Sequence, residues 1–127
     1  MERRPINAAD APAPAGGYAQ AIEVQNANRT LYISGQIPVG LDGAVPSSFA
    51  EQAKLAWQNV EAQLRAADMT FDNLVKVTIF LASRDYTMEN RAARTAAIGD
   101  RKIAMTVVIA GIFDESWLLE IEAIAAA

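Results

Sequence analysis

Two carboxylates near the end of the chain are the first candidates for chemistry. Glu120 and Glu122 interrupt the otherwise apolar run Trp117–Ala126. An ionised carboxylate among buried side chains is costly unless it is paired or hydrogen-bonded. The two glutamates therefore lie either at a solvated rim, where they can pair with lysine or arginine, or in a cleft. In a cleft, one of them can hold a water molecule or a substrate amine.

Other candidates lie at the ends of predicted strands and inside a predicted helix. Tyr18, Ser34 and Gly35 fall at strand ends, although a tyrosine also suits an amphipathic position in a core or an interface. Asn90 is a poor helix former within a helical segment, which favours a side-chain hydrogen bond there. These residue types could position a small polar molecule.

The composition excludes several kinds of site. The chain has 127 residues with no Cys and no His, so it cannot form disulfides, use a thiolate or a Ser-His triad, or ligate zinc through cysteine or histidine. We therefore expect no metal and no cofactor. The formal net charge of −4 argues against nucleic acid as a partner, because phosphate neutralisation needs a basic face.

The hydrophobic pattern predicts elements in the order ββαβαββ. Strands are expected at Tyr18–Gln25, Arg29–Ser34, Leu74–Ala82, Met105–Phe113 and Trp117–Ala126. Helices are expected at Ser48–Ala67 and Tyr86–Ile98. Ser48 and Glu51 fit a capping box at the start of the first helix, and Asp68 stands where that helix should stop.

Turn residues predict two hairpins. The polar segment 26–28 would join the first two strands, and the segment 114–116 would join the last two. Residues 11–17 contain two prolines and two glycines, which predicts that residues 1–17 form a loop-like arm.

These elements predict one α+β domain over residues 1–127, a two-layer fold with a mixed sheet and two helices on one face. The other sheet face must then be solvated or covered by another subunit. Because Met105–Phe113 is apolar on both faces, we expect a homo-oligomer. No apolar run reaches the roughly 20 residues that cross a bilayer. The N-terminus lacks an apolar signal core, so we expect a cytoplasmic protein that is not bound to membranes.

Four segments resemble one known family. Gly17–Ala21 (GYAQA) and Leu31–Pro38 (LYISGQIP) are similar to its motifs G-P-Y-S-Q-A and V-S-G-Q-I-P. Val75–Leu81 (VKVTIFL) and Leu119–Ala125 (LEIEAIA) complete the set. By these motifs, which span nearly the whole chain, it is identified as a member of the Rid family. These reactive intermediate deaminases are also called the YjgF family and are often labelled endoribonuclease L-PSP.

The resemblance implies a chorismate-mutase-like α+β fold, a homotrimer and a cleft between adjacent subunits. It also implies hydrolysis of the imine or enamine of an amino acid to a keto acid and ammonia. By motif, Glu120 would position the water, and Tyr18, Gly35 and Asn90 would line the cleft. Ser34 would contribute to the same wall beside Gly35.

The chain departs from the family at the position that holds the substrate carboxylate. The family motif P-A-R, followed by Ser or Thr, falls on Ile103–Thr106 and puts Met105 where arginine is usual, so the chain resembles an arginine-lacking subgroup. A thioether cannot make the paired, charge-assisted hydrogen bonds of a guanidinium. We expect Met105 to face the same cleft as Glu120 and to make it more apolar. The basic residues that either form a solvated face or supply the missing charge are Arg91, Arg94, Arg101 and Lys102.

Three functions stay open at this point. The first is a Rid-type hydrolase or deaminase of a small unsaturated amine, with Glu120 orienting water. The second is a trimer that binds a metabolite or a partner without turnover, which the presence of Met105 favours. The third is the ribonuclease that the family label implies, and the absence of His and of a basic aromatic groove argues against it.

Overall fold

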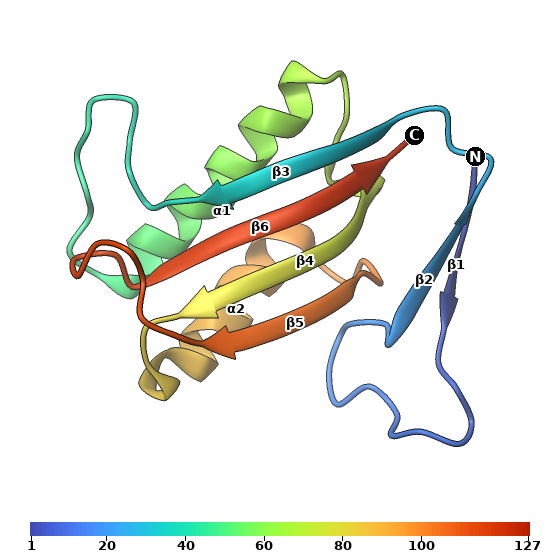
Figure 1. The fold of residues 1–127 in the computed structure, drawn as a ribbon. Helices are drawn as coiled ribbons and strands as arrows, with labels where there is room; N and C mark the ends of the chain where they lie inside the picture. The colour runs from blue at the N-terminus through green and yellow to red at the C-terminus, as the bar shows by residue number, and fades with distance from the viewer.

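The computed structural model describes residues 1–127 and has two layers with an appended ribbon. The main sheet has the spatial order β3 (Thr30–Gln36), β6 (Leu119–Ala126), β4 (Leu74–Leu81) and β5 (Ala104–Ile109). Both helices lie on one face of this sheet (Figure 1): α1 (Phe49–Ala66) and α2 (Thr87–Ile98). The ribbon consists of β1 (Glu2–Ile6) and β2 (Ala21–Gln25). The predicted α+β fold, a mixed sheet with two helices on one face, is confirmed.

Helix α1 begins and ends as the sequence predicts. The Ser48 side chain accepts a hydrogen bond from the backbone N of Glu51 at 3.2 Å, which satisfies one of the free N–H groups of the first turn. The chain leaves the helix through Asp68, whose φ of 56° is left-handed and is tolerated by aspartate better than by most residues. The residues that α1 buries include Phe49, Ala53, Ala56, Trp57, Val60 and Leu64.

Strands β4 and β6 form the centre of the core because their side chains alternate between the two sheet faces. The buried residues that they contribute are Val77, Ile79, Leu81, Leu119, Ile121, Ala123 and Ala125. Glu120 pairs with Phe80 and Glu122 with Thr78. Both glutamates therefore point to the face that the helices do not cover.

The predicted C-terminal hairpin is wrong. β6 lies between β3 and β4 and is antiparallel to both, whereas β5 pairs with β4 in parallel. A parallel pair needs a long crossover, and α2 supplies it. β5 ends at Ile109 rather than at Phe113 because β4 ends at Leu81, which accepts a last hydrogen bond from the backbone N of Ala110 at 3.0 Å.

The predicted N-terminal hairpin is also wrong. β2 pairs with β1, a strand inside the predicted loop-like arm, while β3 pairs with β6. β1 contains Pro5 and charged residues, so no apolar alternation marks it in the sequence. An ion pair between Arg4 and Glu23, 3.2 Å apart, joins the two strands on their exposed side. In Figure 1 this ribbon extends from one end of the main sheet.

Polar contacts attach the ribbon and its connecting loop to that end of the sheet. The Arg3 guanidinium donates to the backbone O of Asp72 at 2.5 Å. Further along, the backbone N of Ala19 donates to the backbone O of Ile103 at 3.1 Å. This second bond places Tyr18 beside the start of β5.

The sheet face opposite the helices has no second layer in the chain (Figure 1). Tyr32 on this face is 76% exposed, and Phe80 and Ile124 are half-buried. That another subunit covers this face stays a prediction. None of the helices combines the length and the hydropathy needed to span a membrane.

Candidate functional site

Glu120 rests directly on the backbone of Gly35. Glu120 lies near the start of β6 and is half-buried, and Gly35 lies in β3 at an irregularity of register between Ile33 and Gln36. A Cβ atom at position 35 would lie 2.7 Å from Cδ of Glu120, closer than real Cβ atoms approach other heavy atoms. Any side chain at position 35 would therefore displace the Glu120 carboxylate from its present place, which glycine leaves open.

Gln52 fixes the chain that leads into β6. It lies on α1 and is only 2% exposed. Its amide nitrogen donates to the backbone O of Pro46 and of Ser116, each at 2.9 Å. Its Oε1 accepts from the backbone N of Leu118 at 2.8 Å, two residues before Glu120. The sequence analysis missed Gln52, and the signal for it is a polar residue on the apolar stripe of a helix.

Ser34 lines a hollow on the uncovered face of the sheet. The hollow has a volume of about 360 Å³ and is lined by Ser34, Glu122 and Lys76, among others, but not by Glu120. Lys76 does not pair with Glu122 there. Its Nζ donates to Oγ1 of Thr106 at 2.7 Å. The structure thus brings Gly35 to Glu120 and Ser34 to Glu122.

Tyr18 and Met105 lie together at the edge of the sheet, and Arg94 joins them. Nη1 of Arg94 is 3.7 Å from Sδ of Met105. A Cβ atom at Gly16 would lie 3.8 Å from the Tyr18 ring and 3.9 Å from Nη2 of Arg94. The Tyr18 hydroxyl accepts a hydrogen bond from the backbone N of Ala15 at 3.2 Å. Three separate segments of the chain therefore meet at one guanidinium, and we call this place the Arg94 nook, made of Gly16, Tyr18, Arg94 and Met105.

The charged guanidinium of Arg94 is partly buried and has no counter-ion. Burial lowers the pKa of its guanidinium, the nearby charge of Arg91 lowers that pKa further, and Tyr18 opposes the shift. Arg94 takes part in none of the ion pairs of the chain. Its hydrogen bond is to a thioether, which is a weak acceptor. The nook is therefore a positive site that lacks an anion.

Asn90 is buried inside α2, one helical turn before Arg94. It is 2% exposed, and its Oδ1 has no hydrogen-bond partner. The helix is held at its start by Tyr86, whose ring stacks on Phe49 with 4.7 Å between centroids. A buried acceptor without a donor is costly. Oδ1 of Asn90 is closed off from solvent in the single chain, so its predicted place in a ligand site stays a prediction.

The two groups of candidate residues lie on opposite faces of one chain. Met105 pairs with Val77, which faces the helices, whereas Glu120 pairs with Phe80, which faces away from them. Met105 and Glu120 therefore do not meet within a single chain, and their place in one cleft between subunits stays a prediction. Their roles in one site remain predictions that require a second copy. No group of three or more acidic side chains could hold a metal ion.

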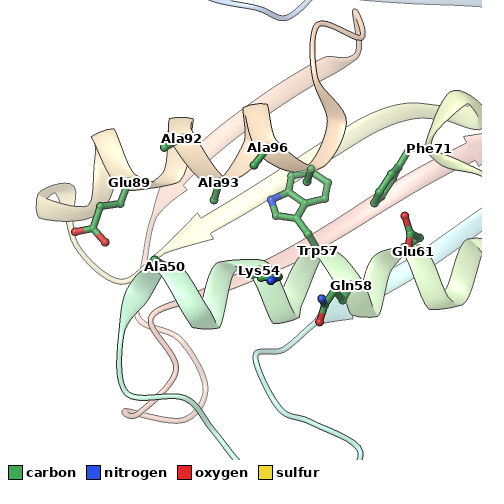
Figure 2. Close-up of a pocket in the computed structure, with 11 residues that line it drawn as sticks. Ala50, Lys54, Trp57, Gln58, Glu61, Phe71, Glu89, Ala92, Ala93 and Ala96 are labelled. Atoms are coloured by element: carbon green, nitrogen blue, oxygen red, sulfur yellow. The ribbon is translucent and has the colours of Figure 1, made fainter.

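A hollow of about 580 Å³ lies between the two helices, away from both groups. Figure 2 shows alanines of α2 along one wall, with Trp57 and Phe71 toward one end. Nε1 of Trp57 is buried and has no hydrogen-bond partner. None of the predicted site residues lines this hollow.

Taken together, these features define a class of protein: a small two-layer α+β domain with one parallel crossover and a carboxylate seated on the uncovered sheet face. The sequence profile of the endoribonuclease L-PSP family matches residues 8–127. The chain belongs to this family, which is also known as the Rid or YjgF family, and the resemblance found in the sequence motifs is confirmed.

Known relatives cover the chain almost completely. The 2-iminobutanoate/2-iminopropanoate deaminase of Mus musculus is 39% identical over 128 residues, covering 97% of this chain and 90% of that protein. The crystal structure of E. coli TdcF with bound serine is 26% identical, covers 98% of each chain and gives a TM-score of 0.73. A Rid family protein of unknown function from Yersinia pestis, YyfB, covers 100% of both chains with a TM-score of 0.84 and 24% identity, and so shows the shared fold alone.

Proposed function

We propose that this protein is a Rid-type deaminase that hydrolyses the imine or enamine of a small amino acid to a keto acid and ammonia. The observation that carries the proposal is the Glu120 carboxylate held against Gly35 on the uncovered face of the sheet. The 39% identity to a mouse protein named 2-iminobutanoate/2-iminopropanoate deaminase supports the reaction class. The serine-bound relative, E. coli TdcF, supports an amino-acid-sized ligand.

In the proposed reaction Glu120 acts as a general base. An enamine first tautomerises to the imine. The oxygen of a water molecule then bonds to the imine carbon while Glu120 accepts a proton from that water. That proton passes to the nitrogen and gives a carbinolamine. Glu120 then moves the hydroxyl proton to the nitrogen as well, the C–N bond breaks, and ammonia leaves as the C=O bond forms. Imine and water thus give keto acid and ammonia without an oxidant or a reductant.

We propose further that the cleft is completed by a second copy of the chain in a homotrimer. The uncovered face presents Tyr32 and Phe80 to solvent beside Glu120, while the Arg94 nook lies at the β5 edge on the helix side. A cyclic arrangement sets the face of one copy against an edge of the next. Light scattering after gel filtration tests the assembly, and a mass of one chain would overturn it.

A second candidate function is binding without turnover. Met105 supports it, because the family's carboxylate-binding arginine is absent at that position. The ribonuclease reading is the weakest, because the chain has no His and carries a net charge of −4. Cleavage of RNA by highly purified protein, abolished by Glu120→Gln, would reverse that order.

The deciding experiment measures turnover directly. An amino acid oxidase acting on 2-aminobutanoate generates 2-iminobutanoate in the assay, and the release of 2-oxobutanoate is followed against the spontaneous rate. Wild-type protein should accelerate release, whereas Glu120→Gln should not. Acceleration that is equal in both would remove Glu120 from the mechanism. Ligand binding without any acceleration would favour the second candidate function.

A further inference from the structure

Arg94 has a half-buried guanidinium that is not paired with any acidic group of the chain. Arg94 is partly buried, forms no ion pair, and contacts Met105 through a sulfur atom at 3.7 Å. A guanidinium has five N–H donors and no acceptor. Charged groups removed from water are normally paired. The donors of Arg94 are therefore available to an anion from outside the chain.

We infer that Arg94 binds the carboxylate of a small-molecule ligand in the nook formed with Gly16, Tyr18 and Met105. The positive charge then comes from Arg94 on α2 instead of from an arginine at position 105. The Arg94 guanidinium contacts Met105, which stands at that position. This inference rests on the proposed function for the identity of the ligand, since the carboxylate would be that of the imine. The binding itself does not require turnover.

The other basic residues named from the sequence do not fit this role. Arg101 pairs with Asp72 at 2.7 Å and donates to the backbone O of Ile98 at 3.0 Å. Arg91 and Lys102 are exposed. Surface cations of this kind are well hydrated and contribute little binding free energy. Only Arg94 among these candidates combines partial burial with the absence of an internal anion.

Tyr18 adds a second hydrogen-bond donor beside Arg94. The Tyr18 hydroxyl already accepts a hydrogen bond from the backbone N of Ala15, so its own proton is free to be donated to a carboxylate oxygen. Donors at Arg94 and Tyr18 together suit the two oxygens of one carboxylate.

Titration with 2-oxobutanoate tests the anion site without catalysis. Calorimetry should show binding to wild type, and Arg94→Ala should weaken it about tenfold or more, since a charge-assisted pair is lost from a partly dry site. Arg84→Ala is the matched control because it removes the same charge from an exposed residue beyond the end of β4, away from Met105 at the start of β5, and it should change the affinity by less than about twofold. Uncharged 2-butanone should bind wild type and Arg94→Ala equally weakly.

Two further variants separate a binding role from a structural one. Arg94→Lys keeps the charge but loses the planar fork, so its affinity should lie between those of wild type and Arg94→Ala. Returning the charge to the strand in Arg94→Ala/Met105→Arg should recover most of the binding. Circular dichroism and thermal melts confirm that each variant is folded before its affinity is compared.

The outcomes also separate this inference from the proposed deaminase. Arg94-dependent binding of 2-oxobutanoate without imine hydrolysis supports the anion site and overturns the deaminase. Hydrolysis whose KM and affinity for 2-oxobutanoate are unchanged by Arg94→Ala supports the deaminase and overturns the anion site. Equal affinity of wild type and Arg94→Ala overturns the anion site whatever the turnover.

Discussion

The seat of Glu120 and the Arg94 nook are built in different ways. The seat lies on central strand β6, against Gly35, and Gln52 fixes the chain just before it. The nook joins a loop, a helix and an edge strand, and its one hydrogen bond between side chains is the 3.7 Å contact of Arg94 with the sulfur of Met105. Groups on central strands are held more precisely than groups on loops and edges. The comparison indicates that the fold fixes the position of Glu120, the proposed water-positioning group, and leaves the Arg94 nook, the proposed ligand-binding group, more open to change.

Substitution of Glu120 should lower the hydrolysis rate more than any other change proposed for the two groups. Glu120→Gln keeps the shape of the side chain but removes the base, so the rate of 2-iminobutanoate hydrolysis should fall about 10²–10⁴-fold. Affinity for 2-oxobutanoate should change far less, because the Arg94 nook is intact. A large loss of affinity would contradict the division of the site into two halves.

Mixing two impaired variants should show whether the two groups come from different copies. Glu120→Gln and Arg94→Ala are unfolded together and refolded as mixed trimers, in which about one quarter of the clefts carry both wild-type groups if adjacent copies share a site. At substrate concentrations well below KM, where the weaker binding of Arg94→Ala lowers its rate about tenfold, the mixture should reach about one quarter of the wild-type rate. Each variant refolded alone is the control. A mixture no faster than the average of the two variants would place both groups in one chain or remove one of them from the site.

Substitution of Gly35 should disturb the seat alone. A methyl group in Gly35→Ala would meet Cδ of Glu120 at 2.7 Å, so the carboxylate must move. We expect a loss of about tenfold or more in hydrolysis rate and of about 1–3 kcal/mol in the free energy of unfolding. The matched control is Gly17→Ala, where a Cβ atom meets nothing within 4 Å. Equal effects of the two changes would contradict the close packing of Glu120 on Gly35.

Substitution of Gln52 should destabilise the segment that leads into β6 and leave the contact between Glu120 and Gly35 largely in place. Gln52→Leu keeps the apolar stripe of α1 but leaves the backbone N of Leu118 without its 2.8 Å partner. The free energy of unfolding should fall by about 1–3 kcal/mol, with a hydrolysis rate reduced only a few-fold. Exposed Gln58 offers a comparison on the same helix, because Gln58→Leu should leave both quantities nearly unchanged. Denaturant titration measures the first quantity.

Local patterns in the sequence predicted the elements well and their partners poorly. Ser48 with Glu51 marks the start of α1, and the alternation of β4 marks both its extent and its buried face. Such signals act within a few residues of one another. Pairing is decided by contacts between distant segments, which is why β6 was expected beside β5 and in fact separates β3 from β4.

The candidate site shows the same difference between residues marked by local sequence and residues placed by contacts between distant segments. Gly35 and Glu120 belong to motifs that local sequence is enough to recognise, and in the structure the Glu120 carboxylate lies against Gly35. Arg94 stood among four basic residues without distinction in the sequence. Its position depends on the phase of α2 against β5 and on where Ala19 attaches the preceding loop. No local spacing encodes that combination.

The contact between Arg94 and Met105 has a consequence for the history of the family. Arginine at both positions would bring two like charges to within a few ångströms, since the present Nη1–Sδ distance is 3.7 Å, and they would repel each other. Arginine at neither position leaves no charge for a carboxylate. Each substitution is therefore favourable or harmful according to the residue already present at the other site. We therefore expect the two positions to vary as a pair in an alignment of the family, and a survey that scores each column by itself would then record a lost function where a charge had only changed its point of attachment.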